Sequence, residues 1–233
     1  MKNKPNFVVV SGVIGVGKTT FTRQLAQLLN WREVFEPVDD NPYLADFTKD
    51  QKQWAYPMQE FLKHRRFAAY QFAFWGLRHG EFPGVILDRS IHEDTVFAEI
   101  NAEIGNIHPR NFDTYKQGFQ DFQAFLPEPD LYVFLDAPVE TCLQRIKLRG
   151  RKAEGASEWS DEIEDGWRGY LTTLHAGYMK WLDAIAPRMQ VVRLDWSSFH
   201  RVEDAWQDVL NQFEARSRFT RSLVTPHVKE TTA

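Results

Sequence analysis

Residues 12 to 19 read Gly-Val-Ile-Gly-Val-Gly-Lys-Thr, a pattern that is typical of a loop that binds nucleotide phosphates. Glycines in such a loop allow successive backbone N–H groups to point at phosphate oxygens. The Lys18 ammonium would reach the outer phosphates, and the Thr19 hydroxyl would bind Mg²⁺. The pattern therefore predicts that a nucleoside triphosphate and Mg²⁺ bind to residues of this short segment: Gly12, Gly15, Gly17, Lys18, Thr19 and Thr20.

Acidic side chains follow two other apolar runs. Glu36 comes after Val34 and Phe35, where a carboxylate can take the proton of an attacking hydroxyl, although an ordinary solvated loop carboxylate also fits this segment. Asp88 follows the run 85–87 and can hold Mg²⁺ opposite Thr19. Arg89 can neutralise charge on a transferred phosphoryl group. A helix N-cap at Asp88 is compatible with this chemistry.

Positive charge gathers at the end of a helix predicted over 138–149. Arg145 and Arg149 are four residues apart and share one face, and Arg151 follows Gly150. Phosphoryl transfer needs added positive charge and exclusion of water, so this cluster suits a lid that closes over a triphosphate. Cations also favour a helix C-terminus through the helix dipole, which is the alternative explanation.

A long helical pattern that begins at Trp54 carries polar side chains suited to a nucleobase. Gln59 has both a donor and an acceptor and can pair with the edge of a base. Met58, Leu62 and Arg66 share a helical face. On this segment alone, an amphipathic core helix with an exposed Gln59 is the simpler interpretation.

Strand-like runs that alternate with helical patterns must position these side chains. The alternation predicts βαβ units and a parallel sheet, with site residues at the carboxyl ends of the strands. We expect one domain over residues 1–233, with a flexible tail at 217–233. The predicted strands cover 7–11, 34–36, 84–88, 130–136 and 190–195, and the predicted helices cover 18–29, 54–79, 91–103, 112–126, 138–149, 161–186 and 202–216.

Composition narrows the class of protein. The chain has 233 residues, of which 43% are hydrophobic, enough to fill the core of one α/β domain. A net charge of −4 does not suggest a nucleic-acid partner. The single cysteine, Cys142, excludes an internal disulfide and fits a reducing compartment. The apolar runs are shorter than a membrane span requires, so we expect a cytoplasmic protein with no membrane partner.

Taken together, the motifs resemble those of the deoxynucleoside kinase family over about residues 6–195. The resemblance is carried by the phosphate loop, the run Glu-Pro-Val at 36–38, the Trp-Ala-x-Pro-x-Gln helix, Asp-Arg-Ser at 88–90 and the Arg-x3-Arg-Gly-Arg segment. The run 36–44 is similar to that of the bacterial branch. The resemblance implies a three-layer P-loop kinase fold with a five-stranded parallel sheet, a lid at about 145–160, and a homodimer.

The resemblance also implies roles for individual residues. Glu36 would be the base for the 5′-hydroxyl of a deoxynucleoside, with Arg89 beside it, and ATP with Mg²⁺ would supply the phosphoryl group. Arg66 and Asp94 occupy positions found in members that accept purines or deoxycytidine, so a purine is the first choice of acceptor and deoxycytidine is the alternative. Thr48 stands where the family usually has a tyrosine for the 3′-hydroxyl. The residues implied for the acceptor are Glu36, Tyr43, Thr48, Met58, Gln59, Arg66, Arg89, Asp94 and Glu154.

Two alternative functions remain open at this point. A nucleoside monophosphate kinase shares the phosphate loop, the Asp-Arg element and a lid, but it needs cations near Glu36, where this chain has acidic residues. A non-catalytic family member that serves as a structural subunit should have lost key residues, whereas Lys18, Glu36 and Arg89 are present. Both alternatives are therefore less favoured than a deoxynucleoside kinase.

Overall fold

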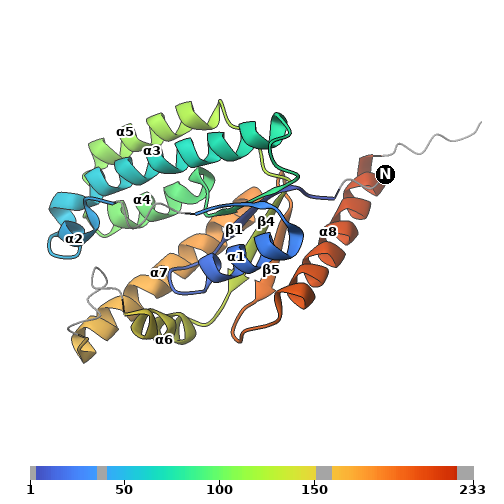
Figure 1. The fold of residues 1–233 in the computed structure, drawn as a ribbon. Helices are drawn as coiled ribbons and strands as arrows, with labels where there is room; N and C mark the ends of the chain where they lie inside the picture. Colours follow the sequence, from blue (N-terminus) through green and yellow to red (C-terminus); the bar gives the residue numbers. More distant parts are fainter. Residues whose placement is uncertain (1–3, 36–40, 151–158, 225–233) are drawn as a thin grey trace, which may run out of the picture.

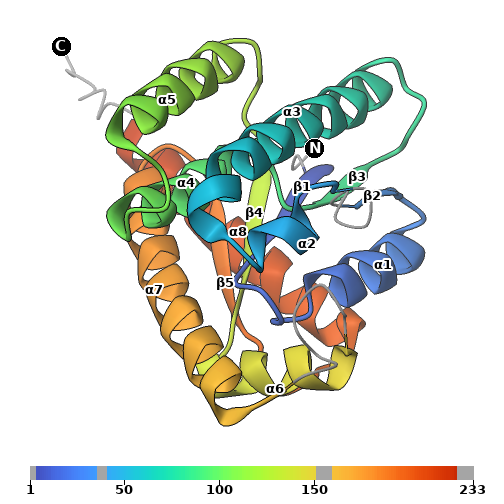
Figure 2. The same cartoon turned by 90° about the vertical axis from the view of Figure 1, so that its left-hand side faces the viewer.

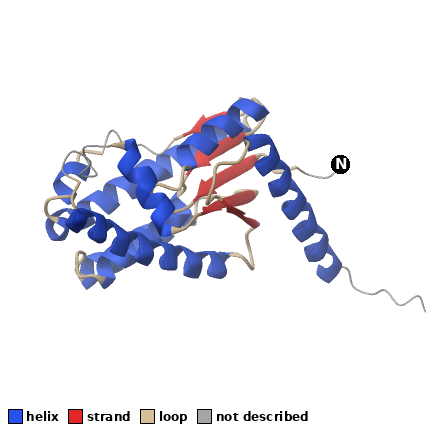
Figure 3. Cartoon of the chain, turned by 90° about the horizontal axis from the view of Figure 1, so that it is seen from below, coloured by secondary structure: helices blue, strands red, loops and turns tan. Residues whose placement is uncertain are grey.

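The sheet of the computed structural model is parallel and five-stranded, with the order β2-β3-β1-β4-β5. The structure describes residues 4–35, 41–150 and 159–224, and the side chains only as far as residue 216. The strands are β1 (Phe7–Ser11), β2 (Arg32–Val34), β3 (Val85–Asp88), β4 (Leu131–Asp136) and β5 (Val191–Asp195). The predicted fold class is confirmed, because these five strands lie between layers of helices (Figure 3).

Two groups of helices enclose the sheet (Figure 1). On one side, α1 (Lys18–Leu29) packs against α8 (Val202–Val224). On the other side, α3 (Gln51–Arg78), α4 (Asp94–Glu103) and α7 (Asp161–Ile185) pack together, and α5 (Pro109–Gln123) runs beside α3 (Figure 2). The remaining elements are α2 (Leu44–Phe47), the 3₁₀ turn η1 (Ile91–Glu93) and α6 (Val139–Arg149).

Strand β2 lies two residues earlier than the predicted strand at 34–36. Its ladder pairs Arg32 with Val85 and Val34 with Leu87, and β3 has only one further residue, Asp88. Pairing stops at Val34, one residue before the end of β3, although the apolar run continues to Phe35. Residues 36–40, which include Glu36, lie outside the described residues.

Helix boundaries also differ from the predicted ones. Helix α3 begins at Gln51 rather than at 54, because the Asp50 carboxylate accepts a hydrogen bond from the Gln53 backbone N–H at 3.0 Å and caps the first turn. The predicted helix at 91–103 is divided into η1 and α4. Helix α8 continues to Val224 instead of ending at 216, and α2 was not predicted.

The core lies between the sheet and both helix layers. Aromatic side chains join the layers: the Phe7 ring of β1 lies 4.9 Å from that of Tyr70 on α3, and the Phe21 ring of α1 lies 5.1 Å from that of Trp196. Because all the strands are parallel, their carboxyl ends open at one edge, where β1 meets the phosphate loop. Among the described helices, none combines the length and apolarity that a membrane span requires.

Candidate active site

The phosphate loop connects β1 to α1. Gly12, Gly15 and Gly17 all have positive φ angles, of 147°, 83° and 109°, which glycine adopts without steric cost. The buried Lys18 ammonium donates to the carbonyl oxygens of Gly12 at 3.1 Å and Val13 at 2.9 Å, and so lies across the loop. Gly17 caps α1 without a side chain, so the helix N-terminus presents backbone N–H groups to an anion. This cradle fits a chain of phosphates.

Thr19 and Asp88, which were predicted together as metal ligands, lie in contact. The Thr19 hydroxyl donates to Asp88 Oδ2 at 2.5 Å. Asp88 is the last residue of β3, and β3 pairs with β1, so the parallel register brings its carboxylate to the start of α1. A hydroxyl and a carboxylate at the phosphate loop are the oxygen donors that Mg²⁺ prefers.

Arg89 lies beside the phosphate loop and is 4% exposed. Its φ angle is 68°, a left-handed conformation that is strained for a residue with a side chain. Its backbone N–H donates to the Val10 carbonyl at 3.0 Å, and its guanidinium donates to the Tyr178 hydroxyl and lies 3.8 Å from Glu93 Oε1. The Phe97 ring covers the guanidinium at 4.8 Å. Neighbours on four elements therefore fix this arginine.

Arg66 and Asp94 form a buried ion pair, in which the Arg66 guanidinium donates to Asp94 Oδ1. Arg66 is 4% exposed and Asp94 is 0% exposed. The two side chains come from α3 and α4, and the Phe97 ring also lies 5.6 Å from the Arg66 guanidinium carbon. The sequence prediction grouped these two residues, and the structure brings them together.

Helix α3 has a polar stripe that consists of Gln59 and Arg66, and both side chains are buried. Met58 and Gln59 are both buried, and Gln59 Oε1 has no hydrogen-bond partner within the described residues. An amide that is buried with an unmatched acceptor costs free energy, which points to a ligand rather than to packing alone. The simpler interpretation, an exposed Gln59, is wrong.

Tyr43 and Thr48, two residues considered for the 3′-hydroxyl, flank helix α2 at its two ends. Thr48 is exposed, and its hydroxyl donates to the Ala45 carbonyl at 2.9 Å within the same turn. The Tyr43 ring is half-buried and lies 5.9 Å from Trp54 and 6.0 Å from Phe61. Tyr43 is thus held against α3, whereas the Thr48 hydroxyl is engaged locally.

Helix α6 packs directly on the phosphate loop. Arg145 donates to the carbonyl oxygens of Val16 at 2.7 Å and Trp196 at 3.0 Å, and it lies 4.4 Å from the Phe199 ring centroid. Phe199 is 67% exposed. Arg149 is exposed at the end of α6, and Arg151 and Glu154 lie outside the described residues. Arg145 therefore connects the phosphate loop to the segment that follows β5, and its contact with a triphosphate stays a prediction.

A small cavity opens at the carboxyl ends of β2 and β3. It is walled by side chains of both strands together with the two buried arginines, and its lining residues are Val34, Phe35, Arg66, Ala69, Leu87, Asp88 and Arg89. Glu36 follows Phe35 directly in the chain, so its position in the sequence is one residue beyond the cavity wall.

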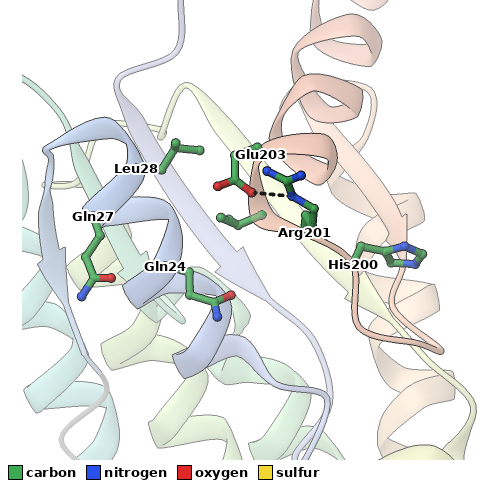
Figure 4. Close-up of a pocket in the computed structure, with 7 residues that line it drawn as sticks. Gln24, Gln27, Leu28, His200, Arg201 and Glu203 are labelled. Carbon is green, nitrogen blue, oxygen red and sulfur yellow. Dashed lines mark ion pairs between the residues drawn. The ribbon is translucent and has the colours of Figure 1, made fainter.

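A wider pocket lies elsewhere, between α1 and the start of α8 (Figure 4). Leu28 and Gln24 of α1 lie on one side of it, and on the other Arg201 forms an ion pair with Glu203 at 3.6 Å. The described residues of the predicted site are absent from its lining. The chemistry that the motifs predict therefore belongs to the sheet edge and not to this larger hollow.

Sequence reasoning missed three residues of the site. Glu93 is fully buried beside Arg89, and Tyr178 supplies the hydroxyl that Arg89 contacts. Burial raises the pKa of Tyr170 on α7 to about 12, and the positive charges of Arg89 and Arg66 oppose this rise. The spacing Ser90-x-x-Glu93 signals a helix start, but it does not reveal which other groups the carboxylate touches.

Comparison with protein families decides what this arrangement belongs to. The family model described as Deoxynucleoside kinase matches residues 8–217, which is most of the chain. The chain belongs to the deoxynucleoside kinase family. It is accordingly a phosphotransferase that uses ATP, and the resemblance predicted from its motifs is confirmed.

Individual relatives of this deoxynucleoside kinase are similar over nearly its whole length. A deoxyadenosine kinase of Dictyostelium discoideum is 36% identical over 219 residues, covering 94% of this chain and 83% of the relative. A deoxyguanosine kinase of Lactobacillus johnsonii is 33% identical, covering 90% and 91%. A solved structure of deoxyadenosine kinase from M. mycoides with bound dATP superimposes with a TM-score of 0.73 at 23% identity, covering 89% of this chain and 99% of that one.

Proposed function

We propose that this chain transfers the γ-phosphoryl group of ATP to the 5′-hydroxyl of a purine deoxynucleoside. The observation that carries the choice of acceptor is the pairing of charge on the acceptor side. Each buried arginine there faces a buried carboxylate: Arg66 faces Asp94, and Arg89 faces Glu93. Positive charge that is already balanced by a neighbouring carboxylate suits an uncharged nucleoside better than a nucleoside monophosphate.

The base would bind along the polar stripe of α3. The Gln59 amide has an acceptor oxygen with no hydrogen-bond partner within the described residues. The Arg66–Asp94 pair, about two helical turns further along α3 at Arg66, adds a second donor and a second acceptor. The relatives with known names include kinases for deoxyadenosine and deoxyguanosine, which supports a purine.

The phosphates would bind on the other side of Arg89. Lys18, which now bonds to the loop carbonyls, would turn to the outer phosphates, and the N-terminus of α1 would hold them. Thr19 and Asp88 would hold Mg²⁺, which supplies charge neutralisation of the phosphates when it is bound. Glu36 would accept the proton of the 5′-hydroxyl, and Arg89 would stabilise the transferring group.

We further infer a single domain with its lid at about 145–160 and a homodimeric assembly. All described strands share one sheet, and the described helices other than α2 contribute residues to one core cluster, which supports the single domain. Phe72 and Trp75 are half exposed on α3, which supports a second copy packing against the long helices. A sedimentation measurement that gives the mass of one chain would contradict the homodimer.

The test is ATP-dependent phosphorylation of the four natural deoxynucleosides beside their monophosphates. Turnover of deoxyadenosine or deoxyguanosine, with none of the monophosphates, is the expected result. Glu36→Gln should then lower the turnover number by roughly 10²–10⁴-fold, because it removes the general base. Glu33→Gln, three residues earlier on β2, is the matched control that should keep its activity. Preferred phosphorylation of a monophosphate would refute the proposal.

A further inference from the structure

The buried carboxylate of Glu93 lies next to Arg89 and has hydrogen-bond partners on more than one element. Its Oε2 accepts from the Ser11 hydroxyl at 2.7 Å, and its Oε1 accepts from the Ser90 backbone N–H at 3.2 Å. The Arg89 guanidinium lies 3.8 Å from Oε1. A carboxylate that is 0% exposed persists in a core only when it is paired and hydrogen-bonded in this way.

The partners of Glu93 belong to both halves of the active site. Ser11 is the last residue of β1 and directly precedes Gly12, so it marks the start of the phosphate loop. Arg89 lies on the acceptor side and follows β3. The Tyr178 hydroxyl of α7 also accepts from the Arg89 guanidinium. One carboxylate thus touches the donor loop and the acceptor arginine.

Capping alone does not account for this arrangement. Ser90 and Glu93 form a capping box at η1, which uses the Glu93 carboxylate only to accept from the Ser90 N–H. The bond to Ser11 and the contact with Arg89 contribute nothing to the cap. The bond to Ser11 connects Glu93 instead to β1, an element that a capping residue has no need to reach.

We propose that Glu93 is a positioning residue, which fixes the Arg89 guanidinium relative to the phosphate loop so that it meets the transferring phosphoryl group. This inference rests on the proposed function, in which Arg89 contacts that group. The left-handed φ of 68° at Arg89 supports it, because a strained backbone persists only where its surroundings hold it. Glu93 and Tyr178 supply that restraint from two directions.

The experiment compares Glu93→Gln with Ser90→Ala in the full chain. Glu93→Gln keeps the size of the side chain but removes the charge that faces Arg89, and it should lower kcat by roughly 10²-fold through misplacement of the guanidinium. The dissociation constant of ATP should change little, whereas the thermal midpoint should fall, because the buried Arg89 guanidinium loses the charge that faces it. Ser90→Ala breaks the other half of the capping box and leaves the carboxylate in place, so it should lower the thermal midpoint while kcat stays near that of the wild type.

A second variant keeps the test decisive if Glu93→Gln does not fold. Tyr178→Phe removes only the hydroxyl that accepts from the Arg89 guanidinium, and its loss of kcat should overlap with that of Glu93→Gln rather than add to it. Retention of wild-type kcat by both variants, or an equal loss in Ser90→Ala, would overturn the positioning role. Absence of deoxynucleoside phosphorylation by the wild-type protein would instead refute the proposed function, so the two failures are distinguishable.

Discussion

Replacement of Gly15 by alanine should disable the phosphate loop, and the structure indicates how strongly. A Cβ atom at Gly15 would lie 2.5 Å from the Cys142 carbonyl oxygen and 2.7 Å from Ile146 Cγ1, both in α6. The backbone oxygen cannot rotate away, so either the loop or α6 must shift. The φ of 83° adds about 1–2 kcal/mol for any L side chain, and overpacking adds about 1–3 kcal/mol, so we expect about 2–5 kcal/mol in all.

Gly105→Ala is the matched control for this prediction. Gly105 has a similar φ of 79°, but no atom of the described residues comes within 4 Å of its Cβ position. It therefore carries only the conformational cost of about 1–2 kcal/mol, and it lies at the end of α4, away from the phosphate loop. Urea unfolding and ATP titration of both variants give the comparison. A Gly15→Ala protein that unfolds like Gly105→Ala and binds ATP like the wild type would refute the steric argument.

Two further predictions concern titration and the end of the lid. Burial lowers the pKa of His92 to about 4 from 6.5. Between these two pH values the unfolded chain binds a proton that the folded chain does not. The free energy of unfolding should therefore fall by on the order of 3 kcal/mol as the pH drops from about 6.5 to about 4. His92→Gln should flatten this dependence in urea titrations at pH 7 and pH 5, and an unchanged pH dependence would contradict the assignment. The Glu164 carboxylate accepts a hydrogen bond from the Trp159 indole at 3.0 Å and from the Lys147 ammonium at 3.2 Å. Glu164→Gln should therefore raise the acrylamide quenching of Trp159 fluorescence. The Trp159 signal is obtained by subtracting the fluorescence of the Trp159→Phe protein. The neighbouring Glu162→Gln should leave quenching unchanged, and the idea fails if the two variants behave alike.

Local patterns predicted the parts of the site that depend on nearby residues or on sheet topology. The phosphate loop follows from its glycine spacing, and the contact between Thr19 and Asp88 follows once the strands are taken as parallel neighbours. Helix periodicity placed Met58 and Arg66 on a shared face, and both side chains are buried. Such features need no knowledge of how distant side chains pack. The burial of Gln59 was not predicted from the α3 segment alone.

Features that depend on a specific partner could not be predicted. The start of α3 is set by the side-chain bond of Asp50, which does not change the apolar pattern. The bonds of the Arg145 guanidinium to the backbone carbonyls of Val16 and Trp196 were not predicted either. The contact of Arg145 with a triphosphate stays a prediction.

Strand register explains why the two halves of the active site are coupled at all. Val10 pairs with Asp88, so β1 and β3 end at the same level, and the phosphate loop and the Arg89 turn leave the sheet side by side. The Arg89 N–H donates to the Val10 carbonyl at 3.0 Å, which extends the ladder into that turn and holds the left-handed conformation at its base. A carboxylate three to five residues beyond β3 can then reach the end of β1, and Glu93 does so. Shifting either strand by one residue would turn Ser11 to the other face and break the connection, so the register of the sheet, rather than any single motif, makes the donor loop and the acceptor arginine one unit.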